Sequence, residues 1–145
     1  MCGILEKIKK VFAKREPSVN PALDKRILTI EDDVTQRTMI QKTLAKKGYT
    51  VFTAENGQKG LETALKEKPD LILLDVMMPG MHGVDVCRRL KSSSQTKDIP
   101  VIFLTSMDMP QDVIEQYVVG GDIHLTKPIN AKELISQVEI SLGLK

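Results

Sequence analysis

The sequence contains little cysteine and no long apolar run. Cys2 and Cys87 are the only cysteines among 145 residues, so nothing indicates disulfides, and a reducing cytoplasm is the expected location. No stretch approaches the roughly 20 apolar residues of a membrane-spanning helix, and the N-terminus lacks the apolar core and cleavage site of a signal peptide. Neither G-x-G-x-x-G nor G-x-x-x-x-G-K-S/T occurs, which disfavours nucleotide binding.

Charge is nearly balanced overall but unevenly distributed. The net charge is +2, yet residues 1–26 carry seven Lys or Arg against three Asp or Glu, whereas residues 27–145 carry 14 against 16. DNA-binding domains normally carry their basic patch on the folded domain itself. An acidic body with a basic arm therefore argues against a nucleic acid as the partner.

Residues 1–25 are predicted to be a basic amphipathic arm and linker, followed by a single domain over residues 26–145. Pro17 and Pro21 interrupt the helical pattern in the linker. Before them, apolar residues recur at helical spacing opposite several lysines: Ile4, Leu5, Ile8, Val11 and Phe12 against Lys7, Lys10 and Lys14. Such a helix over residues 1–15 suits a membrane surface or a partner groove; alternatively, it folds back on the domain or pairs with its copy in a dimer.

Strand-like and helix-like segments alternate after the linker. The apolar segments 26–30, 49–54, 70–75, 99–105 and 122–126 are predicted strands. Helical patterns follow them at 34–47 (closed by Gly48), 57–66, 84–91, 111–119 and 131–142. Five strand–helix units predict a doubly wound α/β domain with a five-stranded parallel sheet and helices on both faces.

Polar residues gather where these strands end. They are Glu31, Asp32, Asp33, Asp75, Thr105, Ser106 and Lys127. Each one alone has an ordinary explanation as a cap, a turn residue or a solvated lysine, and Asp33 with Gln36 fits a capping box. Parallel strands share their polarity, however, so all of these residues meet at one edge of the sheet, where open α/β folds bind ligands.

The composition of this set points to a metal and a phosphoryl group. Converging carboxylates repel one another unless a cation lies between them. Oxygen ligands without a histidine or cysteine cluster favour Mg²⁺. A lysine and a hydroxyl beside a metal-bound carboxylate make a site for a phosphoryl group.

At these residues the chain resembles the receiver domain of two-component response regulators, which has a flavodoxin-like fold. The resemblance covers roughly residues 26–143 and is carried by four motifs, "ILTIEDD", "LILLDVMMPGMHG", "VIFLTS" and "GGDIHLTKPI". It implies that Asp75 accepts a phosphoryl group from a sensor histidine kinase or a histidine phosphotransfer protein. Receivers are not enzymes in the usual sense, although they assist their own phosphoryl transfer and slow dephosphorylation.

The resemblance also implies roles for the surrounding residues. Mg²⁺ would be held by Asp32, Asp75 and the main-chain carbonyl of Met77, with Glu31 acting through water. Lys127 and Thr105 would each contact a phosphoryl oxygen. The Lys127–Pro128 bond is expected to be cis, as the family usually holds it.

Four positions depart from the commonest receiver pattern or tune it. Glu31 replaces the usual first Asp, and His124 stands where the family usually has a Tyr or Phe that switches conformation together with Thr105. The alternative for His124 is a half-buried strand residue without such a role. Met77 and Met107 border the path of the hydrolytic water and lack a group to orient it, which predicts slow dephosphorylation.

The chain ends just after its final helix, so we expect a stand-alone cytoplasmic regulator without an output domain. Phosphorylation would then act through protein contact, at the face built from residues 108–142. The arm adds membrane association as an option. The alternative function is a phosphorylation-independent scaffold or adaptor of receiver fold. A phosphatase of similar fold is disfavoured, because Met77 occupies the position of its second acid.

Overall fold

A computed structural model describes residues 24–78, 80, 83–106, 110 and 123–145. The arm at residues 1–15, Met107 and the expected helix at 111–119 lie outside these described residues, as does much of the 108–142 face. The predictions for them therefore stay predictions. None of the described helices is long and apolar enough to cross a membrane.

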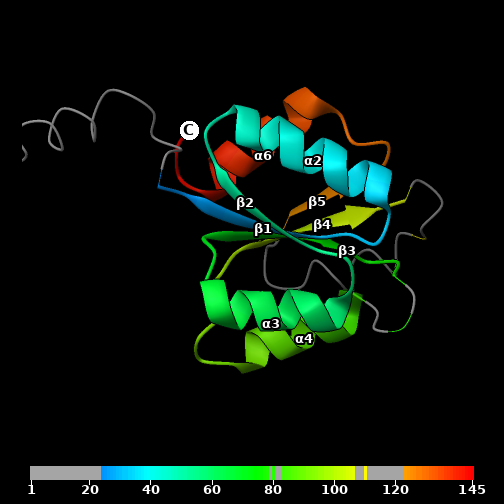
Figure 1. Cartoon of the computed structure of the whole chain (residues 1–145), viewed down its shortest axis with the longest axis vertical. Helices are drawn as coiled ribbons and strands as arrows, with labels where there is room; N and C mark the ends of the chain where they lie inside the picture. The colour runs from blue at the N-terminus through cyan, green and yellow to red at the C-terminus, as the bar shows by residue number, and fades with distance from the viewer. Residues whose placement is uncertain (1–23, 79, 81–82, 107–109, 111–122) are drawn as a thin grey trace, which may run out of the picture.

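The described strands form one parallel sheet in the order β2-β1-β3-β4-β5 (Figure 1). They are β1 (Arg26–Ile30), β2 (Thr50–Ala54), β3 (Leu71–Asp75), β4 (Val101–Thr105) and β5 (Ile123–Thr126). The predicted five-stranded parallel sheet is confirmed. The strand expected at 99–105 begins only at Val101, since Pro100 has no main-chain N–H for the ladder; its carbonyl accepts from Ile72.

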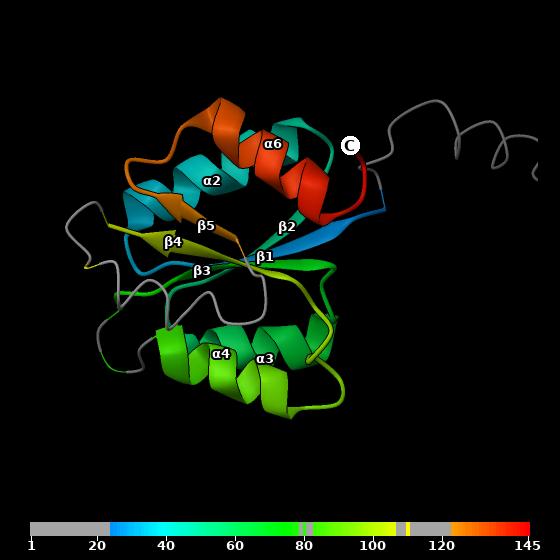
Figure 2. The same cartoon turned by 180° about the vertical axis from the view of Figure 1, so that it is seen from behind.

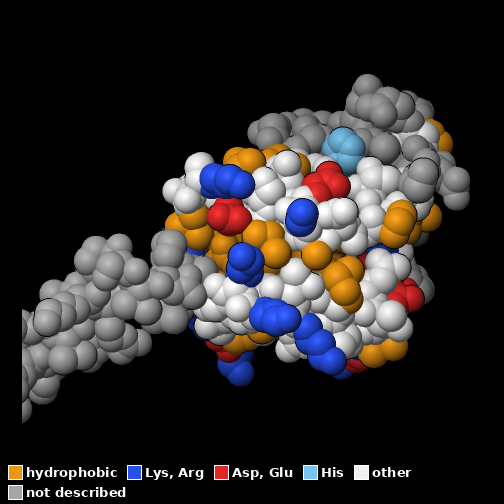
Figure 3. Space-filling view, turned by 90° about the horizontal axis from the view of Figure 1, so that it is seen from above, with side chains coloured by type: hydrophobic (Ala, Val, Ile, Leu, Met, Phe, Trp, Pro, Cys, Tyr) orange, Lys and Arg blue, Asp and Glu red, His pale blue; other side chains and the backbone are white. Residues whose placement is uncertain are grey.

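Helices cover both faces of the sheet, as predicted. Figures 1 and 2 show α2 (Val34–Lys46) and α6 (Ala131–Ser141) on one face, and α3 (Gly57–Glu67) and α4 (Gly83–Ser92) on the other. Seen from the α2 and α6 side, Lys and Arg side chains are spread over the surface (Figure 3). Helix α2 contains Arg37, Lys42 and Lys46 and no acid.

The core consists of two apolar layers, one on each side of the sheet. In β3, Ile72 and Leu74 belong to the layer under α3 and α4, while Leu71 and Leu73 belong to the layer under α2 and α6. All four side chains are 0% exposed. Because β3 is packed on both faces, its last residue, Asp75, is attached to a rigid strand.

Polar side chains set where the helices begin. The predicted cap is confirmed, since Asp33 Oδ1 accepts from the Gln36 main-chain N–H at 2.9 Å. Asn56 and Asn130 cap α3 and α6 in the same way. Gly48 follows α2 with a φ of 101°, a left-handed conformation that favours glycine. The three N-terminal caps fix short loops at the carboxyl edge of the sheet, whereas Gly48 lies at the opposite edge, in the loop from α2 to β2.

Candidate functional site

Three carboxylates converge at the carboxyl edge of the sheet. Glu31 and Asp32 follow β1, and Asp75 ends the neighbouring strand β3. One carboxylate oxygen from each lies within 4.8 Å of the others. Glu31 and Asp75 are buried, at 0% and 2% exposure, whereas Asp32 is exposed. The cluster is therefore open to solvent on the Asp32 side.

Lys127 reaches this cluster from beyond β5. Its Nζ lies 3.1 Å from Asp75 Oδ2 and 3.2 Å from each carboxylate oxygen of Glu31. Burial of the ammonium opposes its charge, but the charges of Asp75 and Glu31 outweigh it and raise the pKa of Lys127. One ammonium thus bridges two buried carboxylates.

Sheet hydrogen bonds continue past the strands and anchor these residues. The Glu31 main-chain N–H donates to Ala54 O at 3.0 Å, and that of Lys127 donates to Thr105 O at 2.7 Å. The N–H of Val76, next to Asp75, donates to Leu104 O at 3.2 Å. The Lys127–Pro128 bond is cis, as the resemblance implied. The backbone of the site residues is therefore held in place by the same hydrogen-bond network as the sheet.

Burial, and after it the negative charge of Asp75 and a hydrogen bond to it, raise the pKa of Glu31 from 4.5 to about 7. Lys127 opposes this rise in part, and its effect is included in that value. Without a bound cation, Glu31 therefore holds a proton over much of the range below pH 7. When both Glu31 and Asp75 are ionised, the pair carries one more negative charge than the Lys127 ammonium neutralises.

The two oxygens of Asp75 have different partners. Oδ2 faces Lys127, and Oδ1 accepts a hydrogen bond from the Met77 main-chain N–H at 3.1 Å. Thr105 is fully buried, and its hydroxyl donates to Leu125 O at 3.4 Å. The Met77 side chain is 61% exposed. Both oxygens of Asp75 are thus held, which fixes the direction of its carboxylate.

His124 is exposed in β5, in register with Phe103 of β4. Within β5 the buried residue is its neighbour Leu125, because side chains alternate along a strand. The alternative of a half-buried His124 is therefore wrong. Its role as a switch stays a prediction.

Gly83 packs against the backbone at the end of β3, a role that the sequence motif did not reveal. A Cβ at this position would lie 2.6 Å from Val76 Cα and 2.9 Å from the main-chain oxygen of Asp75. Both atoms belong to backbone, so any side chain would displace the end of β3. Arg37 is a second unpredicted neighbour, since its guanidinium contacts the main chain of Glu31 and Asp32.

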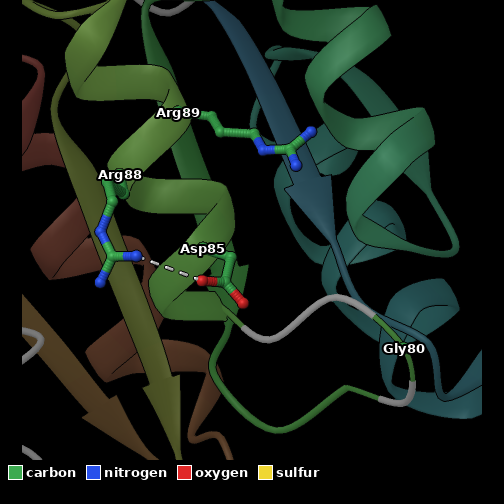
Figure 4. A pocket seen from close by; sticks show the side chains of 4 residues that line it. All are labelled: Gly80, Asp85, Arg88 and Arg89. Carbon is green, nitrogen blue, oxygen red and sulfur yellow. Dashed lines mark ion pairs between the residues drawn. The ribbon is translucent and has the colours of Figure 1, made fainter.

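A separate hollow of about 470 Å³ lies beside the loop that connects β3 to α4 (Figure 4). It is lined by Gly80, Asp85, Arg88 and Arg89. Asp85 and Arg88 form an ion pair at 3.5 Å, and Arg89 extends from another side of the helix. None of the three clustered carboxylates lines this hollow, so it is distinct from the site at the sheet edge.

The donor set fits a magnesium ion. It consists of oxygen atoms from three acids, two of them buried and one open to solvent. Mg²⁺ prefers a few carboxylates and keeps several waters, which an edge site with one open side allows.

Comparison with known proteins agrees with this geometry. The family model described as the response regulator receiver domain matches residues 27–139. The transcriptional regulator RpaA of Synechocystis is 40% identical over 117 residues, which are 81% of this chain and 48% of RpaA. The chain thus spans about half the length of this relative, and it spans 52% of the phosphate regulon regulator PhoB of Pseudomonas aeruginosa.

Other relatives match over nearly their whole length. Protein PilH of Pseudomonas aeruginosa is 36% identical over 118 residues, which are 81% of this chain and 98% of PilH. The receiver domain of the sensor histidine kinase PA1611 from the same species superposes with a TM-score of 0.75 at 26% identity. That match covers 82% of this chain and 98% of the solved one, whose active-site cleft holds a magnesium ion.

We predict that the metal-free protein loses stability as the pH rises from about 4.5 to 7. A group whose pKa is raised on folding, here Glu31 from 4.5 to about 7, stabilises the fold fully below its unfolded pKa and loses that contribution through its folded pKa. Urea unfolding in EDTA at several pH values measures the trend, with Glu31→Gln as the reference that lacks the titration. Identical pH trends in the two proteins would contradict the assignment to Glu31.

Proposed function

The chain belongs to the family of response regulator receiver domains, and on this basis we propose that it is a stand-alone regulator phosphorylated on Asp75. Receiver domains accept phosphoryl groups from histidine kinases or phosphotransfer proteins. The match to PilH, over 98% of that protein, supports a single-domain regulator. The observation that carries the choice of Asp75 is its position, at the end of a strand buried on both faces and 3.1 Å from the Lys127 ammonium.

The proposed reaction is an in-line displacement on phosphorus. A carboxylate oxygen of Asp75 forms a bond to the phosphorus of the donor's phosphohistidine, and the phosphorus–nitrogen bond breaks as the imidazole leaves. There is little other covalent chemistry, so catalysis depends on orientation and on charge neutralisation. Asp75 meets the first need because both of its oxygens are already held. Lys127 meets part of the second by binding a phosphoryl oxygen.

Mg²⁺ would supply the remaining positive charge at the phosphoryl oxygens. Its proposed ligands are Asp32, Asp75 and the main-chain carbonyl of Met77, with Glu31 acting through water. The convergence of the three carboxylates within 4.8 Å supports this, as does the magnesium ion in the cleft of the PA1611 receiver. With a divalent cation present, Lys127 would no longer have to balance both acids and could bind the incoming phosphoryl group.

Thr105 offers a route from Asp75 to the output face. Its hydroxyl now donates to the main-chain oxygen of Leu125 in β5. If the hydroxyl turns to a phosphoryl oxygen instead, that bond between β4 and β5 breaks, and Leu125 and its exposed neighbour His124 can rearrange. We propose that the face built from residues 108–142 reads out this change by binding a target protein.

A receiver-fold scaffold without phosphorylation is the less supported alternative. Two acids buried beside a lysine stabilise a fold poorly compared with apolar side chains of similar size. A scaffold therefore has no structural need for Glu31 and Asp75 at this edge. A phosphoacceptor site needs them, because Asp75 is the nucleophile and both acids help to hold the cation.

We expect acetyl phosphate with Mg²⁺ to phosphorylate the purified protein, and Asp75→Asn to abolish this. The amide of asparagine cannot act as the nucleophile in place of the carboxylate. Migration on a Phos-tag gel measures the modification, with Asp85→Asn as the matched control, because Asp85 is an acid of α4 paired with Arg88 outside the site. An unmodified wild type would refute the proposed function, and a modified Asp75→Asn would place it on another residue.

We further predict that phospho-Asp75 persists for minutes or longer. Met77, 61% exposed beside the acid, offers no strong hydrogen bond to orient an attacking water. Loss of a positioning group slows a reaction by on the order of ten- to a hundred-fold, or about 1.4–2.7 kcal/mol of barrier. Decay of the purified phosphoprotein in Mg²⁺ buffer measures the lifetime, and Met77→Asn should shorten it. A wild-type half-life of seconds, or no effect of Met77→Asn, would count against this role.

A further inference from the structure

Arg37, on the first turn of α2, contacts the loop that carries the first two acids of the site. Its Nη1 donates to the main-chain oxygen of Glu31 at 2.8 Å and to that of Asp32 at 3.3 Å. We propose that Arg37 is a positioning residue, which holds these two acids in the orientation that binds a divalent cation. The inference rests on the proposed function, because it concerns the same site.

The two carbonyls that Arg37 binds belong to consecutive peptide planes. The oxygen of Glu31 lies in the plane before the Asp32 Cα, and the oxygen of Asp32 lies in the plane after it. Peptide planes are rigid, so holding both restricts the two backbone dihedrals between them. One nitrogen of Arg37 therefore fixes the backbone of Asp32 and with it the direction in which the carboxylate leaves the chain.

Asp32 needs this support more than Glu31 does. Glu31 is fully buried, is hydrogen-bonded by Lys127, and is joined to β2 through its main-chain N–H. Asp32 is exposed, so core packing does not restrain its side chain. Its position relative to Asp75 consequently depends on the backbone of the loop.

Helix α2 gives Arg37 a fixed base from which to act. The Arg37 main-chain N–H donates to Asp33 O at 2.9 Å, and Asp33 Oδ1 caps the helix by accepting from the Gln36 N–H at 2.9 Å. Asp33 thus joins the loop to the first turn of α2 through both its main-chain oxygen and its side chain. From this turn the guanidinium folds back over the loop, and its charge strengthens the bonds to the carbonyl oxygens.

The direction in which removal of Arg37 changes the affinity for Mg²⁺ distinguishes a positioning role from a purely electrostatic one. A guanidinium near the site repels a divalent cation, so charge alone predicts that removing Arg37 tightens Mg²⁺ binding. If Arg37 orients the ligands, removing it should weaken Mg²⁺ binding. Mutation of residues that orient metal ligands typically lowers the affinity for the metal by about 10- to 100-fold. A residue that only stabilises the fold would change the unfolding temperature and leave the affinity of the folded protein unaltered.

Calorimetric Mg²⁺ titration of wild type, Arg37→Met, Arg37→Lys and Arg88→Met decides among these outcomes. Arg88→Met removes the same charge from the surface of α4, where the Arg88 side chain is 73% exposed. Each protein is titrated well below its unfolding temperature, measured by circular dichroism. We expect Arg37→Met to bind Mg²⁺ about ten-fold or more weakly, Arg37→Lys to lie between it and wild type, and Arg88→Met to match wild type.

Arg37→Met binding as tightly as wild type, or more tightly, would overturn the proposal. If Arg37→Met does not fold, Arg37→Lys decides in its place, and unchanged affinity overturns the proposal in the same way. Hydrogen exchange in the metal-free protein gives a second readout, since the amides of residues 32–34 should exchange faster without Arg37. A wild type that binds no Mg²⁺ would instead refute the proposed function itself.

Discussion

The structure depends on how two buried carboxylates are kept beside each other. Glu31 and Asp75 are almost fully buried, and the Lys127 ammonium lies between them at 3.1–3.2 Å. Removing one member of such a group leaves an uncompensated buried charge, which destabilises a protein strongly. The acids come from β1 and β3, while the lysine follows β5, so this interaction spans the sheet across β4. The fold and the chemistry of the site are therefore linked through one lysine.

Charge balance also explains why the site suits a cation and a phosphoryl group. One lysine does not neutralise three acids, and burial together with the charge of Asp75 raises the pKa of Glu31 to about 7. A divalent cation would complete the balance and release Lys127 to a new anion. The surrounding backbone is held for this exchange by close contacts, with Gly83 against the end of β3 and Arg37 on the β1–α2 loop. Both contacts are made to main-chain atoms, so they restrain the backbone that carries the ligands.

The sequence predicted the sheet and the meeting of the acids because both follow from local patterns. Alternating strand and helix signals imply parallel strands, and parallel strands bring Asp75, Glu31 and Lys127 to one edge. The cap at Asp33 followed from its spacing to Gln36. Pairwise geometry could not be predicted in this way. Nothing in the pattern indicates that Arg37 folds back on two carbonyls, that Gly83 touches backbone, or that His124 faces solvent, because these depend on side-chain conformation and close packing in three dimensions.

The central claim is that the acids at the sheet edge form a cation site around Asp75. A crystal structure grown with Mn²⁺ in place of Mg²⁺ tests it most directly, since carboxylate and carbonyl oxygens suit both ions and the anomalous signal of Mn²⁺ locates it. We expect one ion bound to Asp32 and Asp75, with Lys127 moved away from at least one of its two present partners. An ion bound elsewhere, or no ion at a saturating concentration, would contradict the claim.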